Sequence, residues 1–156
     1  LVKAFEDNNV TIKADEECRR ICKNLEPAEK EDWAAEYGDK TVSIKAVKDI
    51  FDAIAHINIY GSGHTDCILS KNPGNIELFM NLVDSAGVFA NASTRFADGF
   101  RYGLGAEVGI STNKTHARGP VGLEGLTIYK YKLYGNGQIA GEYCSGEKHF
   151  KHERLI

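Results

Sequence analysis

The sequence predicts an α/β protein built on parallel strands. Apolar residues alternate with polar ones over residues 41–47, and apolar residues recur at helical spacing in the segment that follows. The same change of period occurs again before residue 90, which gives the order βαβαβ. That order is typical of parallel strands joined by right-handed crossovers. With 156 residues, of which 42% are hydrophobic, the chain is long enough for one domain with its own core.

Before this unit, the first residues are predicted to be the end of a helix that begins upstream of Leu1, because no capping residue precedes the apolar face. An extended segment over Val10 to Ala14 leads to Asp15, a predicted helix N-cap. Cys18 and Cys22 then lie on the apolar face of the helix, so we interpret them as core residues rather than as a thiol pair or metal ligands. Residues 26–40 are charged and are predicted to be irregular.

Three strands and two helices make up the βαβαβ unit. Thr41 to Val47 is the first predicted strand, and Asp49 is predicted to cap a helix that ends at Gly61. The second strand is Cys67 to Leu69, followed by a helix opened by Asn75, and the third is Gly87 to Ala90.

The C-terminal part is predicted to contain an exposed strand. A short helical piece around Leu123 leads to Leu126 to Tyr134, where apolar or aromatic residues alternate with lysines before the hairpin-type turn Gly135-Asn136-Gly137. Such a strand is either an ordinary sheet edge or a contact between copies of the chain. We therefore divide the chain into a catalytic-type α/β part (1–125), an oligomerisation strand with its turn (126–137) and a polar tail (138–156).

Composition limits the classes of partner. A net charge of −3 and a pI near 6.0 provide no bulk attraction to nucleic acid or to acidic membranes. No apolar run approaches the roughly 20 residues of a membrane span, and the first 15 residues do not resemble a signal peptide. The four cysteines fit a reducing compartment and show no metal-ligand spacing. We expect a cytoplasmic protein with no metal, no nucleic-acid partner and no membrane contact.

The candidate functional residues are concentrated between residues 84 and 120. Asn91, Ser93 and Thr94 follow directly on a predicted strand, and ligands of open α/β sheets bind beyond the carboxyl ends of the strands. Basic or potentially basic side chains follow them, namely Arg95, Arg101, Lys114, His116 and Arg118. A guanidinium group can bind a carboxylate or phosphate through two hydrogen bonds, so this stretch predicts an anion site, with a solvated basic loop as the alternative.

Two other motifs contain residue types found in functional sites. His64, Asp66 and Cys67 suggest a nucleophile beside its base, but strand alternation turns Cys67 away from the other two. We expect His64 and Asp66 to cap or to form hydrogen bonds, with a site role for His64 as the alternative. Gly103 and Gly105 lack the third glycine and the strand-to-helix context of a dinucleotide-binding fingerprint.

Three runs of residues resemble a known family. NASTRFADGFRYGLGAEVGIST, HARGPVGLEGL and GSGHTDCIL are similar to the C-terminal part of the γ-glutamyl phosphate reductases, or glutamate-5-semialdehyde dehydrogenases, of the aldehyde dehydrogenase superfamily. The resemblance implies an NADPH-dependent enzyme of proline biosynthesis that reduces L-glutamyl 5-phosphate through a cysteine thiolate. It also implies that this cysteine and the nucleotide-binding domain lie upstream of Leu1, so that the chain holds no catalytic residue and is inactive alone.

The resemblance also implies roles for individual residues. Glu36 matches the acidic residue that contacts the nicotinamide ribose, although Gly38 departs from the larger apolar residue usual there. Asn91, Ser93, Thr94 and Arg95 match the loop beside the acyl phosphate substrate, and His116 with Arg118 matches the HARGP turn. The family further implies a homo-oligomer that forms through residues 126–134. Two alternatives stay open: a non-catalytic interaction module, and the reductase half of a bifunctional pyrroline-5-carboxylate synthase.

Overall fold

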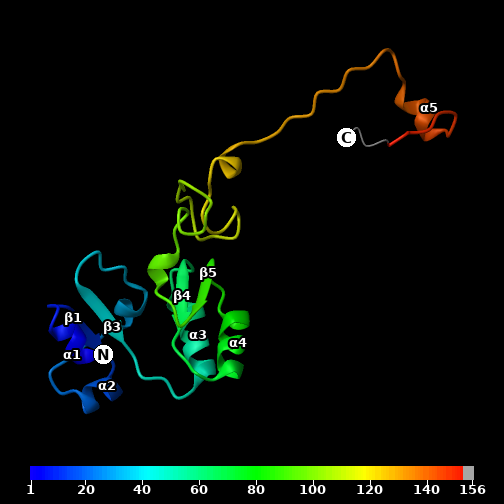
Figure 1. Cartoon of the computed structure of the whole chain (residues 1–156). Helices are drawn as coiled ribbons and strands as arrows, with labels where there is room; N and C mark the ends of the chain where they lie inside the picture. The colour runs from blue at the N-terminus through cyan, green and yellow to red at the C-terminus, as the bar shows by residue number, and fades with distance from the viewer. Residues whose placement is uncertain (153–156) are drawn as a thin grey trace. The chain divides into compact units, whose positions relative to one another are not determined.

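The computed structural model describes residues 1–152, which divide into two units, one over Leu1–Leu126 and a second that begins at Thr127. The first unit holds two small parallel sheets with their helices (Figure 1). Within the described residues, no helix is both long and apolar enough to cross a membrane.

The first sheet has the strand order β2-β1-β3 and is parallel throughout. Its strands are β1 (Thr11–Ala14), β2 (Glu26–Pro27) and β3 (Thr41–Ile44), with α1 (Val2–Glu6), α2 (Glu16–Ile21) and the 3₁₀ helix η1 (Lys30–Ala34) between or before them. Ile12, Ala14 and Leu25 form its core, and Cys18 and Cys22 pack against that core as predicted. Asp15 caps α2 by accepting a hydrogen bond from the Cys18 amide at 2.9 Å, which confirms the predicted cap.

The second sheet pairs β4 (Thr65–Ile68) with β5 (Gly87–Ala90), also in parallel. The helices α3 (Ile50–Tyr60) and α4 (Pro73–Leu82) pack on this pair, and Ile54, Phe79 and Val83 form the core between them. Asp49 caps α3 as predicted, whereas α4 is capped by Asn72, three residues before the predicted start. The proline at the start of α4 is compatible with its first turn because no intrahelical donor is needed there.

The predicted α/β class and the order strand, helix, strand, helix, strand over residues 41–90 are confirmed, but the three strands do not share one sheet. β3 pairs with β1 from Thr11↔Thr41 to Ala14↔Ile44, and not with β4. The extended segment before Asp15 supplies a partner of matching length, and Val42 and Ile44 complete the core beneath it. The charged segment 26–40 is also more ordered than expected, since it contains β2 and η1.

The C-terminal unit differs from the prediction. Leu126 ends the 3₁₀ helix η3 (Glu124–Leu126), and residues 127–134 belong to no β-ladder within the part of the chain that is described. A ladder requires a second backbone, and the single chain does not supply one here. After the turn, where Gly137 has φ 80°, the chain enters α5 (Ala140–Cys144) rather than a returning strand. The predicted polar tail therefore contains a helix, and its last residues, 153–156, lie outside the described part.

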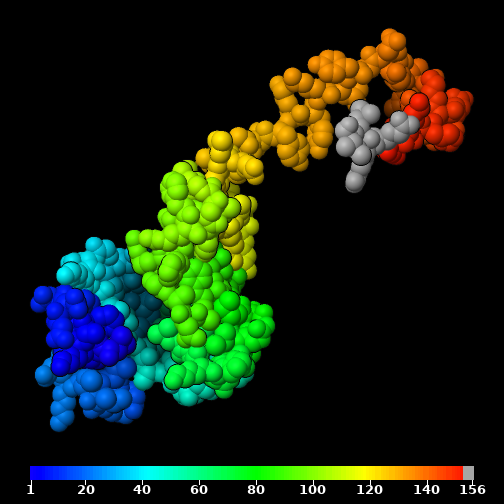
Figure 2. Space-filling view, viewed as in Figure 1, coloured from blue at the N-terminus to red at the C-terminus, as the bar shows by residue number. Residues whose placement is uncertain are grey.

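Side chains of the segment 127–134 are strongly exposed in its own unit (Figure 2). Ile128 is 97% exposed, and the aromatic and apolar residues that alternate after it, at 129, 131, 133 and 134, are between 82% and 90% exposed. Exposed apolar residues in such a run are typical of a surface that another chain or segment covers.

Candidate functional site

The carboxyl ends of β4 and β5 carry the first group of predicted site residues. Asn91 has a left-handed backbone with φ 54°, and its side chain binds the Ser70 backbone twice, through Oδ1 at 2.9 Å and Nδ2 at 2.8 Å. These two bonds tie the loop after β5 to the loop after β4. Ser93 Oγ accepts a hydrogen bond from the Arg95 amide at 3.2 Å and so caps the 3₁₀ helix η2 (Thr94–Phe96). Asn91 and Ser93 thus shape the loop through their own hydrogen bonds.

Arg95 is available for a ligand at this end. The residue is exposed, and its guanidinium forms no hydrogen bond or ion pair with residues 1–152, while its backbone carbonyl accepts a hydrogen bond from Arg101. The Thr94 hydroxyl is likewise without a side-chain partner in the described chain. The loop therefore presents one unpaired cation and one hydroxyl next to each other.

Arg118 occupies the opposite end of the same strand pair. Its guanidinium donates to Asp84 Oδ1 at 3.0 Å, to the Asp84 carbonyl at 3.0 Å and to the Gly63 carbonyl at 3.2 Å. Gly63 and Asp84 precede β4 and β5, so this arginine joins the loop 111–120 to the amino ends of the strands. The side chain is 22% exposed, and its Nε is buried with no partner among the described residues.

Two cations share the Asp84 carboxylate. Lys114 Nζ lies 2.6 Å from Asp84 Oδ2, and Arg118 binds the other oxygen. These hydrogen bonds, that of Lys114 first, hold the pKa of Asp84 below its ordinary value. The predicted cationic cluster is therefore divided, because Arg95 and Arg118 lie at opposite ends of the strand pair. The charge of Arg118 is already balanced by Asp84. His116 is exposed on the same loop and has no partner within residues 1–152.

Glu36 follows η1 at the first sheet, next to a buried polar network that the sequence did not reveal. Asp32 is 7% exposed and accepts hydrogen bonds from Lys13 Nζ at 2.7 Å, the Glu29 amide at 2.8 Å and Tyr37 Oη at 2.9 Å. The Lys13 hydrogen bond is the main cause of the lowered pKa of Asp32. The network holds both ends of the turn that carries Glu36, and the Glu36 carboxylate is exposed with no partner in the described chain.

The cysteine and histidine motif does not form a catalytic pair. The Cys67 thiol donates to the Ala92 carbonyl at 3.0 Å, while His64 Nδ1 is 2.7 Å from Thr65 Oγ1. Asp66 Oδ2 accepts from Ser85 Oγ at 2.5 Å. The three side chains therefore have separate partners, and His64 and Asp66 form hydrogen bonds as expected. Across the described residues, no group of three or more His, Cys, Asp or Glu side chains could hold a metal ion.

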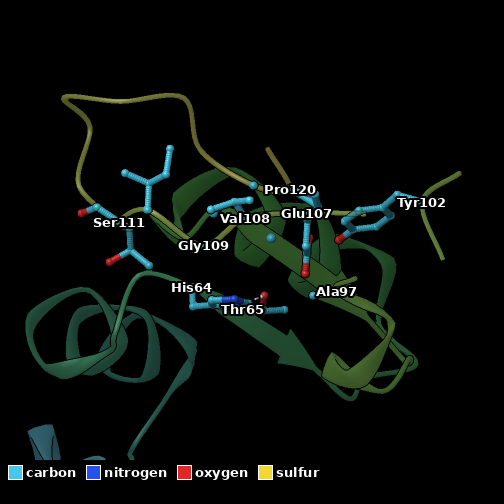
Figure 3. Close-up of a pocket in the computed structure, with 14 residues that line it drawn as sticks. His64, Thr65, Ala97, Tyr102, Glu107, Val108, Gly109, Ser111 and Pro120 are labelled. Atoms are coloured by element: carbon cyan, nitrogen blue, oxygen red, sulfur yellow. Dashed lines mark hydrogen bonds between the residues drawn. The ribbon is translucent and has the colours of Figure 1, made fainter. Parts of the chain in front are cut away.

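A cavity of about 320 Å³ lies at the amino ends of β4 and β5 (Figure 3). Its lining includes His64 and Thr65 at the start of β4, Tyr102, Glu107 and the start of the loop 111–120. None of the residues predicted to bind substrate or cofactor lines it. Sequence reasoning missed Glu107, although it is the only acidic residue between Asp98 and Glu124.

The fold and the known relatives define the class of protein. No family model matches the chain. The crystal structure of γ-glutamyl phosphate reductase from Thermotoga maritima superposes with a TM-score of 0.79 and 43% identity, over 88% of this chain and 33% of that chain. The fold is accordingly aldehyde dehydrogenase-like.

Sequence comparison identifies the relatives within that class. The chain is 59% identical to the γ-glutamyl phosphate reductase of Brachyspira hyodysenteriae over 155 residues, which cover 99% of this chain and 36% of that protein. It is 52% identical to the enzyme of the same name from Haloquadratum walsbyi over 160 aligned positions. The predicted resemblance is confirmed: the chain corresponds to a C-terminal portion of the γ-glutamyl phosphate reductases and spans about a third of the length of these relatives.

Proposed function

We propose that the chain is the C-terminal part of an NADPH-dependent reductase that converts L-glutamyl 5-phosphate to L-glutamate 5-semialdehyde and phosphate, in proline biosynthesis. The identity of 59% over 99% of the chain is the observation that carries this proposal. The placement of residues 91–95 supports it, because they follow β5 at the strand ends where ligands of α/β sheets bind.

Within this function, the exposed side chains of Arg95 and His116 donate hydrogen bonds to the anionic substrate. Arg95 and His116 have no charged partner in the described chain, and Thr94 adds a hydroxyl donor. Guanidinium is suited to the phosphate or the carboxylate of the substrate, since both accept two parallel hydrogen bonds. Asn91, Ser93 and Arg118 support the site by holding the loops in place through the hydrogen bonds described above.

Glu36 is proposed to contact the cofactor. Its exposed carboxylate can accept hydrogen bonds from the ribose hydroxyls of a nicotinamide nucleotide, and the Asp32 network fixes the turn that presents it. When bound, NADPH supplies the hydride of the reaction.

The nucleophile is proposed to lie in the part of the family sequence that this chain does not match. Cys18 and Cys67 fit structural roles instead. Burial raises the pKa of Cys18 to about 11, which disfavours the reactive thiolate, and Cys67 donates to a backbone carbonyl. The chain alone is therefore expected to be inactive, as is any oligomer formed by residues 127–134 without the rest of the enzyme.

The exposed segment 127–134 is the observation that favours the alternative of an interaction module. In the proposed enzyme this segment pairs with a second copy of the chain, which would provide the backbone partner that a strand needs. The reductase and the interaction module exclude each other only if residues 127–134 form contacts in a protein that has no catalytic activity.

The activity can be measured in the reverse direction in a full-length reductase carrying this sequence. Glutamate 5-semialdehyde, NADP⁺ and inorganic phosphate should yield NADPH, and omission of phosphate should abolish the signal because phosphate is a reactant. Absence of phosphate-dependent NADPH formation would contradict the proposed function. In that case, a stable dimer of the inactive protein would favour the interaction module.

A further inference from the structure

The cavity at the amino ends of β4 and β5 has a charge character opposite to that of the loop after β5. Among its fourteen lining residues there is no lysine or arginine, and Glu107 is the one carboxylate. The other polar side chains that line it include His64, Thr65, Tyr102 and Thr112. A lining of this kind suits a cation or a neutral donor better than a phosphate or a carboxylate.

Glu107 is held firmly by its neighbours in the chain. The next residue, Val108, donates its amide to the Val121 carbonyl at 2.9 Å and forms an isolated antiparallel bridge with that buried residue. On the other side is Gly99, where an added Cβ would lie 3.1 Å from Glu107 Cβ and 2.4 Å from the Gly105 carbonyl oxygen. The backbone next to Glu107 is thus tied to Val121 through Val108, and Gly99 lies close to Glu107 on the other side.

Glu107 is exposed, and its carboxylate has no partner within the described part of the chain. It forms no hydrogen bond or ion pair with residues 1–152, and Figure 3 shows its side chain directed into the cavity toward Ala97 and Thr65, with the Tyr102 ring beside it. Arg118, the arginine of the adjoining loop 111–120, is already paired with Asp84. An unpaired carboxylate at the wall of a cavity whose other lining residues are mostly apolar or uncharged can accept hydrogen bonds from an ammonium group.

We propose that this cavity binds a primary ammonium group, with Glu107 as its carboxylate partner, and that the ligand is the α-ammonium of the amino-acid substrate. This inference rests on the proposed function, whose substrate carries that ammonium in addition to its two anions. The Tyr102 hydroxyl and Thr65 Oγ1 offer further oxygen acceptors around the same space. Glu107 then favours the substrate that carries the α-ammonium over the same carbon chain without it. Arg95 binds an anionic group of the substrate.

The test compares two substrates in the reverse assay of the full-length reductase. Glutamate 5-semialdehyde carries the ammonium, and 5-oxopentanoate is the same chain without it. The wild-type enzyme should favour the first by about tenfold or more in kcat/KM, as expected for a charged hydrogen bond. Glu107→Gln should lose most of that preference by lowering kcat/KM for the ammonium-bearing substrate, with little change for 5-oxopentanoate.

Glu77→Gln is the matched control because Glu77 lies on α4, outside the cavity, and glutamine can still accept the Asn81 hydrogen bond. This variant should keep the wild-type preference. An active wild-type enzyme without preference for the ammonium, or a Glu107→Gln variant that loses both substrates equally, would overturn the inference. An enzyme inactive with both substrates would instead refute the proposed function and remove the basis of the inference.

Discussion

The two ends of the β4–β5 pair carry arginines that look equivalent in the sequence but have different surroundings. At the carboxyl end, Arg95 is exposed and has no charged partner in the described chain. At the amino end, Arg118 binds Asp84 and two backbone carbonyls. A basic side chain in a glycine-rich loop is therefore no sufficient sign of an anion site, because its acidic partner can lie far away in the sequence.

The largest expected effect on stability comes from the amino end. Arg118→Ala removes three hydrogen bonds of a side chain that is 22% exposed and leaves Lys114 as the only cation on Asp84. We expect the free energy of unfolding to fall by about 1–2 kcal/mol, which corresponds to a decrease of about 2–8 °C in Tm for a domain of 150–250 residues. Thermal unfolding of the full-length reductase measures it. A Tm equal to that of the wild type would contradict the structural role.

A smaller effect is expected in the pH dependence of stability that arises from Asp84 and its partners Lys114 and Arg118. The pKa of Asp84 in the folded protein is lowered by Lys114 and Arg118 from its ordinary value of 3.8. Between the lowered and the ordinary pKa the unfolded chain binds more protons, so the stabilisation is present above about pH 4 and is lost as pH falls through the lowered value.

The comparison that isolates this group is Asp84→Asn, which cannot titrate. Unfolding midpoints of the variant and the wild type, measured between pH 2 and pH 6, should converge as the pH falls, because protonation removes the same charge. A difference that stays constant over the whole range would assign the effect to something other than the Asp84 charge.

Local features of the fold were readable from the sequence, whereas pairings over long distances were not. The caps Asp15 and Asp49 and the end of α3 at Gly61 follow from neighbouring residues, and the structure confirms them. The pairing of β3 with β1 depends on which extended segments meet in space, and alternation alone does not contain that information. The βαβαβ order was therefore correct while its assignment to one sheet was wrong.

The same distinction applies to the candidate site. The loop 91–95 was located by its position after a strand, which is a local property. The pairing of Arg118 with Asp84 spans 34 residues, and the network around Asp32 joins Lys13 to Tyr37. Glu107 offered one local signal, a single carboxylate within a basic stretch, but its cavity is built by residues from 64 to 120. Partners that are distant in the chain decide which charged groups remain free.

The most direct test of the division between the two ends is the effect of Arg95→Ala on the full-length reductase. The account predicts a fall of about tenfold or more in kcat/KM for the phosphate-dependent reaction, since about 1.5 kcal/mol of charged hydrogen bonding is lost, with an unchanged Tm. Unchanged kcat/KM would remove Arg95 from the anion site and contradict the assignment of anion binding to the carboxyl end of β5.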